Sequence, residues 1–245
     1  MADPSLRSAS AFVDDITNNT ITLAKPAGTV DGDVLVAVFS LDNSSDWTVN
    51  PPTRSGWSVL GALQSSTLDG HELYALYKVA SGEPSTMAFT HVSNQRWSAV
   101  MLCYQNVDTS GSPIDVTGGA SDSNNNASPI TITGPSLTTT TARTLVVQLM
   151  GGDPTSNTTG SWSAPSGYST DAAGYAAFIP LAAFSKLFTS AGATGTAAAT
   201  LTPASGNAGW MVINFALKGV SGASDFPPVP EPPFVHANLN PILAR

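Results

Sequence analysis

The chain is poor in cysteine, histidine and charge. Only 11% of its 245 residues are charged, against about 25% in an ordinary soluble domain. One cysteine excludes an intrachain disulfide framework, and Cys103, inside an apolar segment, is expected to be a small core residue. His71, His91 and His236 lack the close spacing of a local zinc motif. The sequence therefore predicts no metal site.

Positive charge is also scarce. Nine Lys and Arg residues are scattered singly, and the formal net charge is −8. Nucleic-acid binding takes its affinity from clustered cations, and docking on anionic lipid needs them too. The longest apolar run, Val34 to Phe39, is far too short to span a bilayer. We therefore expect neither nucleic acid nor a membrane among the partners.

Catalytic signatures are missing from the sequence. It has no Gly-x-Ser-x-Gly elbow, no phosphate-binding Gly-Lys-Ser/Thr loop and no dinucleotide fingerprint. We therefore predict that the protein is not an enzyme, with no catalytic residue and no cofactor.

Two oxygen-rich segments leave a question about calcium. Asp31 and Asp33 flank a glycine, and Asp42 and Asp46 enclose a short polar stretch. Ca²⁺ accepts oxygen ligands of this kind, but neither segment has the glycine and distal glutamate of a helix-loop-helix calcium site. Turn-forming Asp and Asn account for both segments, so calcium binding stays open.

What the chain does contain is strand-forming sequence. Hydroxyl and β-branched residues suit pleated surfaces, whereas long helices would need more Glu, Lys, Arg and Leu. Short apolar segments alternate with turn signals, which is typical of an antiparallel β-sandwich. The predicted strands are 8–13, 20–24, 34–41, 57–63, 71–79, 86–91, 96–104, 130–133, 144–150, 175–188, 196–202 and 210–217.

The landmarks of the first half recur in the second, about 108 to 115 positions later and in the same order. Each half has an apolar strand, then a tryptophan, a turn into Gly-Trp or Gly-Tyr, a strand with a lysine, and a tryptophan-led strand. Such repetition predicts two similar halves that close on one core. The matched aromatic residues are Trp47 with Trp162, Trp57 with Tyr168, and Trp97 with Trp210.

From this repeat we predict an all-β, antiparallel, jelly-roll-like sandwich with two pseudo-repeated halves over residues 1–220. Residues 118–128, rich in Gly, Ser, Asp and Asn, are expected to form an exposed loop between the halves. Tryptophans at repeated positions are expected to be packing elements rather than sugar-binding platforms. The shared core is predicted to include Leu35, Val36, Leu145 and Val147.

Residues 221–245 differ in character from the rest. A Ser-Gly-Ala-Ser stretch precedes a proline-rich segment, and proline fixes φ and lacks a backbone donor. We therefore predict an extended C-terminal arm that binds a neighbouring subunit, with folding back onto its own domain as the alternative. The candidate partner-binding residues are Phe226, Phe234, Val235, Leu239, Ile242 and Leu243.

Several short groups of residues, weak singly but characteristic in combination, resemble a family of β-sandwich proteins encoded by tailed bacteriophages and prophages. The similarity covers nearly everything except the arm. The groups are Lys25-Pro26-Ala27-Gly28-Thr29, Gly32-Asp33-Val34-Leu35-Val36-Ala37, Pro52, Gly56-Trp57, Leu76-Tyr77-Lys78-Val79-Ala80, Glu83-Pro84, Tyr104-Gln105-Asn106-Val107-Asp108, Pro113-Ile114-Asp115, Thr138-Thr139-Thr140 and Ala216-Leu217-Lys218.

The resemblance implies a virion structural protein on the particle surface, either a head decoration or a tail or fibre component. It supplies no catalytic residues. We expect a homo-oligomer whose partners are major capsid or tail subunits, and we favour a capsid decoration or minor capsid protein anchored by the arm. The alternative is a tail-associated or fibre-associated adhesin that binds host-surface glycan. Related domains occur at varied positions, so the head or tail location does not follow from the family.

Overall fold

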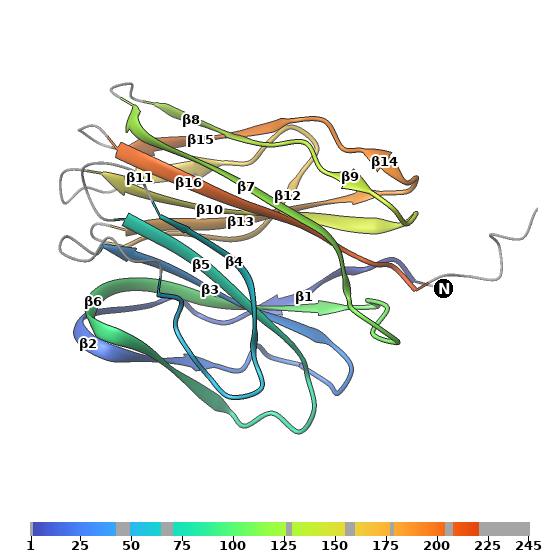
Figure 1. Ribbon diagram of the computed structural model, residues 1–245, viewed down its shortest axis with the longest axis horizontal. Coiled ribbons are helices and arrows are strands. Elements are labelled where there is room, and N and C mark those ends of the chain that lie inside the picture. Colours follow the sequence, from blue (N-terminus) through green and yellow to red (C-terminus); the bar gives the residue numbers. More distant parts are fainter. Residues whose placement is uncertain are drawn as a thin grey trace, which may run out of the picture.

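Every regular element of the described chain is a β-strand. The computed structural model describes residues 2–42, 50–64, 71–125, 129–154, 160–176, 179–203 and 208–220. The strands form two sandwich-like halves that lie face to face (Figure 1). The predicted all-β antiparallel class with two repeated halves is therefore confirmed. The predicted arm, residues 221–245, lies outside the described residues.

The first half contains one large antiparallel sheet, which we call the first main sheet. Its strand order is β1-β6-β3-β5-β4, and β2 pairs with β6 as well. The strands are β1 (Ser5–Ala9), β2 (Val13–Ala24), β3 (Val34–Asp42), β4 (Ser58–Gln64), β5 (His71–Val79) and β6 (Thr86–Gln105).

The second half contains the second main sheet, with strand order β12-β13-β10-β16-β7. A covering sheet of order β11-β15-β8 and a short β14-β9 pair complete it. The strands are β7 (Ile114–Asn125), β8 (Ile130–Gly134), β9 (Thr138–Thr139), β10 (Thr144–Pro154), β11 (Gly160–Ser163), β12 (Ser169–Ala176), β13 (Ile179–Phe188), β14 (Gly192–Ala193), β15 (Ala197–Pro203) and β16 (Ala208–Leu217).

The strand orders of the two main sheets are equivalent. Reading β7-β16-β10-β13-β12 beside β1-β6-β3-β5-β4 matches each strand to one at the same place in the sheet. The register agrees, because Trp97 pairs with Leu41 of β3 and Trp210 pairs with Gly152 of β10. The repetition of sequence landmarks is therefore a repetition of strand positions.

A repeated turn leads into β4 of the first main sheet and into β12, the equivalent edge strand of the second. Trp57 N donates to Arg54 O at 3.2 Å, and Tyr168 N donates to Pro165 O at 3.0 Å. The glycine before each aromatic residue has positive φ, 79° at Gly56 and 76° at Gly167. Glycine adopts this conformation without a Cβ clash, which explains why both halves carry Gly before the aromatic residue.

The halves meet through a central apolar layer between the two main sheets. Because successive strand residues point to opposite faces, one alternate set on each central strand enters this layer. Val36, Leu145 and Val147 lie in it, as predicted. Leu35 does not, because it is one position out of phase with Val36 and lies in the outer core of the first half. The prediction that Leu35 joins the shared core is therefore wrong.

Each half also has an outer core on the far side of its main sheet. In the first half, Ile21 of β2 and Phe89 of β6 pack with Leu35 and Phe39 of β3. In the second half, the covering sheet packs on Met150, Phe184 and other residues of the second main sheet. The central strands are thus buried on both faces, which explains why their sequences are mostly apolar.

The largest error of the sequence prediction concerns residues 118–128. Residues up to Asn125 belong to β7, an edge strand that pairs with β16, and residues 126–128 lie outside the described residues. Gly118 and Gly119 therefore pair in a ladder although their composition is that of a loop. Tertiary pairing overrides local propensity here, since an edge strand needs one partner and few apolar side chains.

Other strand boundaries differ in detail. The predicted strands 86–91 and 96–104 are one strand, β6. Residues 14–19, which separate the predicted strands 8–13 and 20–24, lie within β2, whose register shifts twice as it follows β6. The predicted strand 175–188 is divided between β12 and β13, and Pro180 lies just beyond the last pair that β13 makes with β10. The missing donor of Pro180 therefore interrupts no pair with β10.

We predict that the halves unfold as one unit, because the central layer is built by both. Replacing Phe215, fully buried in that layer, by alanine should lower the free energy of unfolding by about 3 to 5 kcal/mol. Hydrogen exchange followed by mass spectrometry should show the same loss of protection in β3 and β10. The half-exposed Val59→Ala is the control, with an expected change within about 0.5 kcal/mol. Loss of protection in β10 alone would contradict joint unfolding.

Candidate functional site

The two main sheets leave two seams where their edge strands face each other. At one seam β1 lies against β12, and at the other β4 lies against β7. In the equivalent strand orders β1 corresponds to β7, and β4 corresponds to β12. Each seam therefore joins the same two kinds of edge strand, and the two seams occupy equivalent positions. The repeated strand arrangement therefore does not require the two seams to carry different side chains.

A β-bulge occurs at the same position in both halves. In β4 the pairing with β5 shifts between Val59 and Gly61, so that Leu60 is the extra residue. In β12 the pairing with β13 shifts between Thr170 and Ala172, so that Asp171 is the extra residue. Bulges redirect a side chain, and here both side chains turn toward the centre of the sandwich. Leu60 packs in the central apolar layer, whereas its counterpart is a carboxylate.

Hydroxyl groups from two strands hold the Asp171 carboxylate. Tyr104 of β6 donates its hydroxyl to Oδ2 at 2.8 Å, and Ser185 of β13 donates to Oδ1 at 2.7 Å. The first hydrogen bond crosses from the first main sheet to the second. A polar connection between the halves thus lies at the margin of a mainly apolar layer.

Burial changes the acidity of this pair. Removal from water raises the pKa of Asp171 to about 6, although the bonds from Ser185 and Tyr104 favour its ionised form. Burial, and next the nearby Asp171, raise the pKa of Tyr104 well above its usual value. Tyr104 therefore keeps its proton and acts as a donor, while Asp171 titrates at mildly acidic pH.

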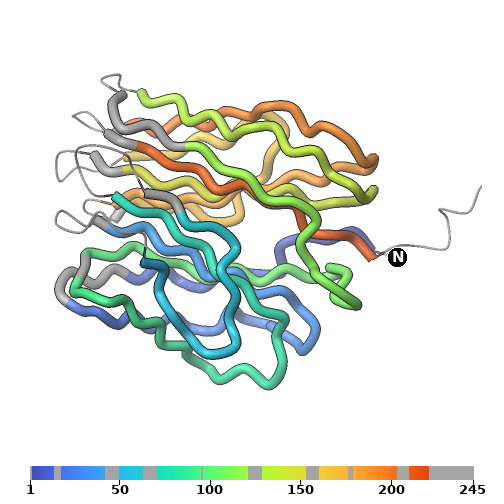
Figure 2. Tube along the Cα trace, in the orientation of Figure 1, coloured from blue at the N-terminus to red at the C-terminus, as the bar shows by residue number. Residues whose placement is uncertain are grey.

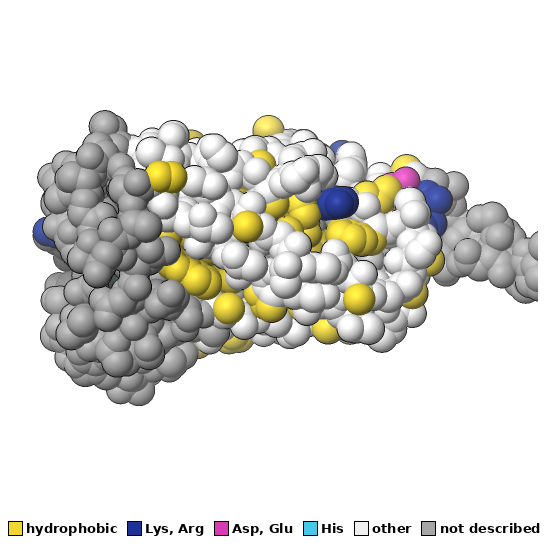
Figure 3. All heavy atoms as spheres, turned by 90° about the horizontal axis from the view of Figure 1, so that it is seen from above, with side chains coloured by type: hydrophobic (Ala, Val, Ile, Leu, Met, Phe, Trp, Pro, Cys, Tyr) yellow, Lys and Arg dark blue, Asp and Glu magenta, His cyan; other side chains and the backbone are white. Residues whose placement is uncertain are grey.

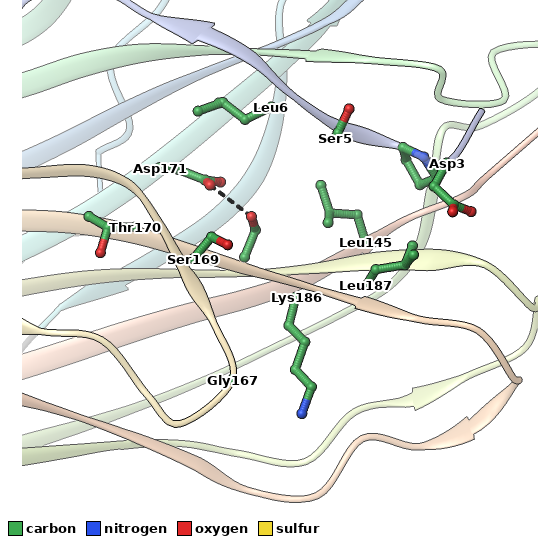
Figure 4. Close-up of a pocket in the computed structure, with 12 residues that line it drawn as sticks. Asp3, Ser5, Leu6, Leu145, Gly167, Ser169, Thr170, Asp171, Lys186 and Leu187 are labelled. Carbon is green, nitrogen blue, oxygen red and sulfur yellow. Dashed lines mark hydrogen bonds between the residues drawn. The ribbon is translucent and has the colours of Figure 1, made fainter.

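A groove of about 460 Å³ lies beside this carboxylate (Figure 4). The N-terminal segment and β1 form one wall, and β12, β13 and the start of β10 form the others. Its lining mixes hydroxyl, apolar and charged side chains. The residues are Asp3, Pro4, Ser5, Leu6, Leu145, Gly167, Ser169, Thr170, Asp171, Ser185, Lys186 and Leu187.

Lys186 does not neutralise Asp171. It follows Ser185 in β13, so the two side chains leave opposite faces of the strand. Its ammonium nitrogen lies 5.1 Å from the ring centre of Phe188 and 5.7 Å from that of Tyr168, and it points away from Asp171 in Figure 4. The lysine stacks on aromatic rings instead.

The hollow at the opposite seam is smaller and differently lined. This hollow, about 140 Å³, is lined by Leu60, Ala62, Ile213 and the backbone around Gly118. No charged side chain lines it among the described residues. The carboxylate groove is therefore a specialisation of one seam.

The candidate calcium ligands that the structure describes have other partners. Asp33 accepts hydrogen bonds from Arg7 Nε at 2.8 Å and Nη2 at 3.1 Å, and from the backbone of Val30. Asp31 accepts from the backbone of Gly82 at 2.8 Å. The Asp42 side chain and all of Asp46 lie outside the described part of the chain. Within that part, no group of three or more His, Cys, Asp or Glu could hold a metal ion.

A second polar group is buried near the other end of the central layer. Ser40 Oγ and His71 Nε2 lie 3.0 Å apart, and both residues are fully buried. Burial lowers the pKa of His71 to about 3, so the imidazole is neutral at physiological pH. A substrate has no access to a pair with no exposed surface, so we regard this pair as structural.

The tryptophans pack against the cores, as predicted for those that the structure describes. Trp97 is 1% exposed and Trp210 is 9% exposed. Trp57 packs edge-on against Phe89, and Trp162 donates its indole hydrogen to the carbonyl of Gly174. Trp47 lies outside the described residues.

The predicted partner-binding residues all lie outside the described residues: Phe226, Phe234, Val235, Leu239, Ile242 and Leu243. The structure does show where the chain approaches them. Gly219 bridges to Val107 and packs closely on Arg143 and Pro4. The N-terminal residues and the end of β16 therefore lie together, at an end that we call the exit pole (Figure 2).

Sequence reasoning missed Asp171, Tyr104 and Ser185 as a group. No local motif marks them, because they come from three strands. A signal was nevertheless present in the repeat: aligning the two Gly-aromatic turns places Asp171 opposite Leu60. A carboxylate that aligns with a leucine indicates a polar group at an inward position.

Comparison with known proteins identifies no relative. No protein-family model, curated protein or solved structure matches this chain. Within the described ranges, no helix has the length and apolar character needed to cross a membrane.

We predict that Asp171 makes stability depend on pH. Its folded-state pKa is raised, so its favourable contribution is fully present below about pH 4 and is lost as pH rises through about 6. The cost of ionisation corresponds to about 2 to 3 kcal/mol at neutral pH. Asp171→Asn should flatten the fall in Tm between pH 4 and 7, measured by calorimetry.

Asp108→Asn is the matched control. Hydrogen bonds from Ser110 lower the pKa of Asp108, so its contribution is lost as pH falls rather than as it rises. This variant should keep the wild-type loss of stability between pH 4 and 7. If Asp171→Asn showed the same fall in Tm between pH 4 and 7 as the wild type, ionisation of Asp171 would not destabilise the folded state.

Proposed function

We propose that this protein is a structural protein of a tailed-bacteriophage virion, displayed on the particle exterior. Within that class we favour a capsid decoration or minor capsid protein anchored by its C-terminal segment. The proposal combines the family resemblance of residues 25–218 with the arrangement of the fold. Its partners are the major capsid or tail subunits and further copies of itself.

The observation that carries the proposal is the exit pole. Asn106 donates to the carbonyl of Asp3, and Arg143 forms an ion pair with Asp3 at 2.6 Å. These contacts hold the N-terminal segment beside Gly219, from which residues 221–245 continue. An anchoring segment that leaves from one pole allows the whole sandwich to project from a particle surface.

The exterior supports a role in cohesion or display. Figure 3 shows a face on which uncharged side chains dominate and charged ones are few. Such a surface suits contacts with neighbouring protein subunits, because the core of a protein–protein interface has fewer charged residues than the rest of a protein surface. With a net charge of −8, it does not suit a phosphate backbone.

We predict that removal of residues 221–245 prevents incorporation into particles. The proline-rich segment loses little conformational entropy on docking, and each buried apolar side chain contributes about 1.5 to 3 kcal/mol. Particles purified after complementation with the truncated chain should lack it by mass spectrometry. Undiminished incorporation would refute anchoring by this segment.

A point-substituted chain provides the control for that experiment. Replacing Phe234, Leu239 and Ile242 by serine keeps the length and the prolines of the segment. This variant should also fail to join particles, while its Tm in solution should equal that of the wild type. If the Tm of this variant fell below that of the wild type, its failure to join particles would be explained by impaired folding instead.

We also predict that particles without the protein assemble but fail at lower temperature. A protein that binds only the assembled shell stabilises that state by mass action. Heating purified particles and following genome release measures the effect. Particles that stay equally robust but lose attachment to host cells would replace this proposal with the glycan-binding adhesin.

A further inference from the structure

Asp171 has no cationic partner among the described residues, in contrast to Asp33 and Glu83. Asp33 pairs with Arg7 at 2.8 Å, and Glu83 pairs with Lys78 at 2.5 Å. The hydrogen-bond partners of Asp171 are the neutral hydroxyls of Tyr104 and Ser185. Charge-assisted bonds with a cation are stronger than bonds with neutral donors.

The surrounding charged groups do not supply that cation. Arg143 pairs with Asp3 across the rim of the groove, and the ammonium group of Lys186 lies over Tyr168 and Phe188. Arg7, on β1, pairs with Asp33. Among the described residues, these three neighbouring cations are therefore already engaged elsewhere.

The fold itself does not require a carboxylate at this position. At the equivalent bulge, Leu60 packs in the central layer, and the hollow beside it is about 140 Å³ rather than about 460 Å³. Burying a carboxylate without a cation is costly. This desolvation cost arises at the seam that contains Asp171, which also has the larger of the two hollows.

The groove also has the lining that a long basic side chain needs. Leu6, Leu145 and Leu187 offer apolar contacts for methylene groups. Ser169 and Thr170 add hydroxyl groups beside Asp171 (Figure 4). An aliphatic stem would lie along the leucines while its charged head reaches the carboxylate.

We propose that this groove docks a protein segment carrying an arginine or lysine side chain whose charged head pairs with Asp171. The inference rests on the proposed function, because on a particle the segment would belong to a neighbouring subunit. Charge complementarity favours such an occupant, since the groove offers a carboxylate that has no cationic partner among the described residues, on a protein of net charge −8.

Docking of a cation should displace the proton of Asp171. With its pKa near 6, the carboxyl is about one-tenth ionised at pH 5 and about nine-tenths ionised at pH 7. Affinity should therefore be about tenfold higher at pH 7. Tyr104 stays protonated over this range, and Asp3 and Lys186, the other charged groups of the lining, do not face Asp171 as free partners.

The test uses the full chain and the peptide N-acetyl-Leu-Ala-Arg-amide, with N-acetyl-Leu-Ala-citrulline-amide as the neutral isostere. Two-dimensional NMR at pH 7 should show saturable shifts at the amides of Ser169, Thr170 and Ala172 with the arginine peptide. The citrulline peptide should bind at least tenfold more weakly, because a hydrogen bond to a charged group is replaced by a neutral one.

Two variants complete the test. Asp171→Asn should lower the affinity for the arginine peptide at least tenfold and remove its pH dependence, while Asp108→Asn should change neither. Asp171→Asn removes the charge of a partly buried carboxylate, so we expect it to fold, and its Tm checks this. Equal binding of both peptides, or binding unaffected by Asp171→Asn, would overturn the inference. The proposed function is judged separately by incorporation of the truncated chain.

Discussion

The structure depends on the apolar layer between the two main sheets. Residues from both halves enter it, including Val36, Leu73, Val147 and Phe215, and each is completely buried. Because the same strands also bury their opposite faces in the outer cores, β3 and β10 have almost no contact with water. Burial on both faces explains why these strands are mostly apolar. Gln148 in the middle of β10 and Asn214 of β16 are buried polar exceptions.

The Asp171 cluster is informative because that layer is mainly apolar, with Ser40 and His71 as a second buried polar pair. At one seam, equivalent positions hold Leu60 and the backbone of Gly118, which fit a dry contact. At the other, a carboxylate is held by one hydroxyl from each main sheet. The two halves of this duplicated fold can be compared directly, and the comparison shows that packing at this bulge does not require a polar residue. The proposed role in partner binding and the proposed virion function both place the relevant surface near the exit pole.

Much of the fold could be predicted from the sequence, because strand length, alternation and turn glycines are local properties. His71 to Val79 and the repeated Gly-aromatic turns are found where the sequence indicated them. The assignment of Leu35 to the shared core was wrong, since a single-residue phase decides which face of a doubly buried strand a side chain occupies. Gly118 and its neighbours were misassigned because an edge strand tolerates the composition of a loop.

The sequence by itself determined the all-β class, the two repeated halves and the scarcity of cations, because each of these is a matter of composition or order along the chain. Only the tertiary structure decided which seam carries Asp171, that Tyr104 and Ser185 bind it, and that residues near both Pro4 and Gly219 share one pole. These features join residues from distant strands. Their contacts follow from strand register and from the packing of one sheet on the other, and no local pattern encodes either.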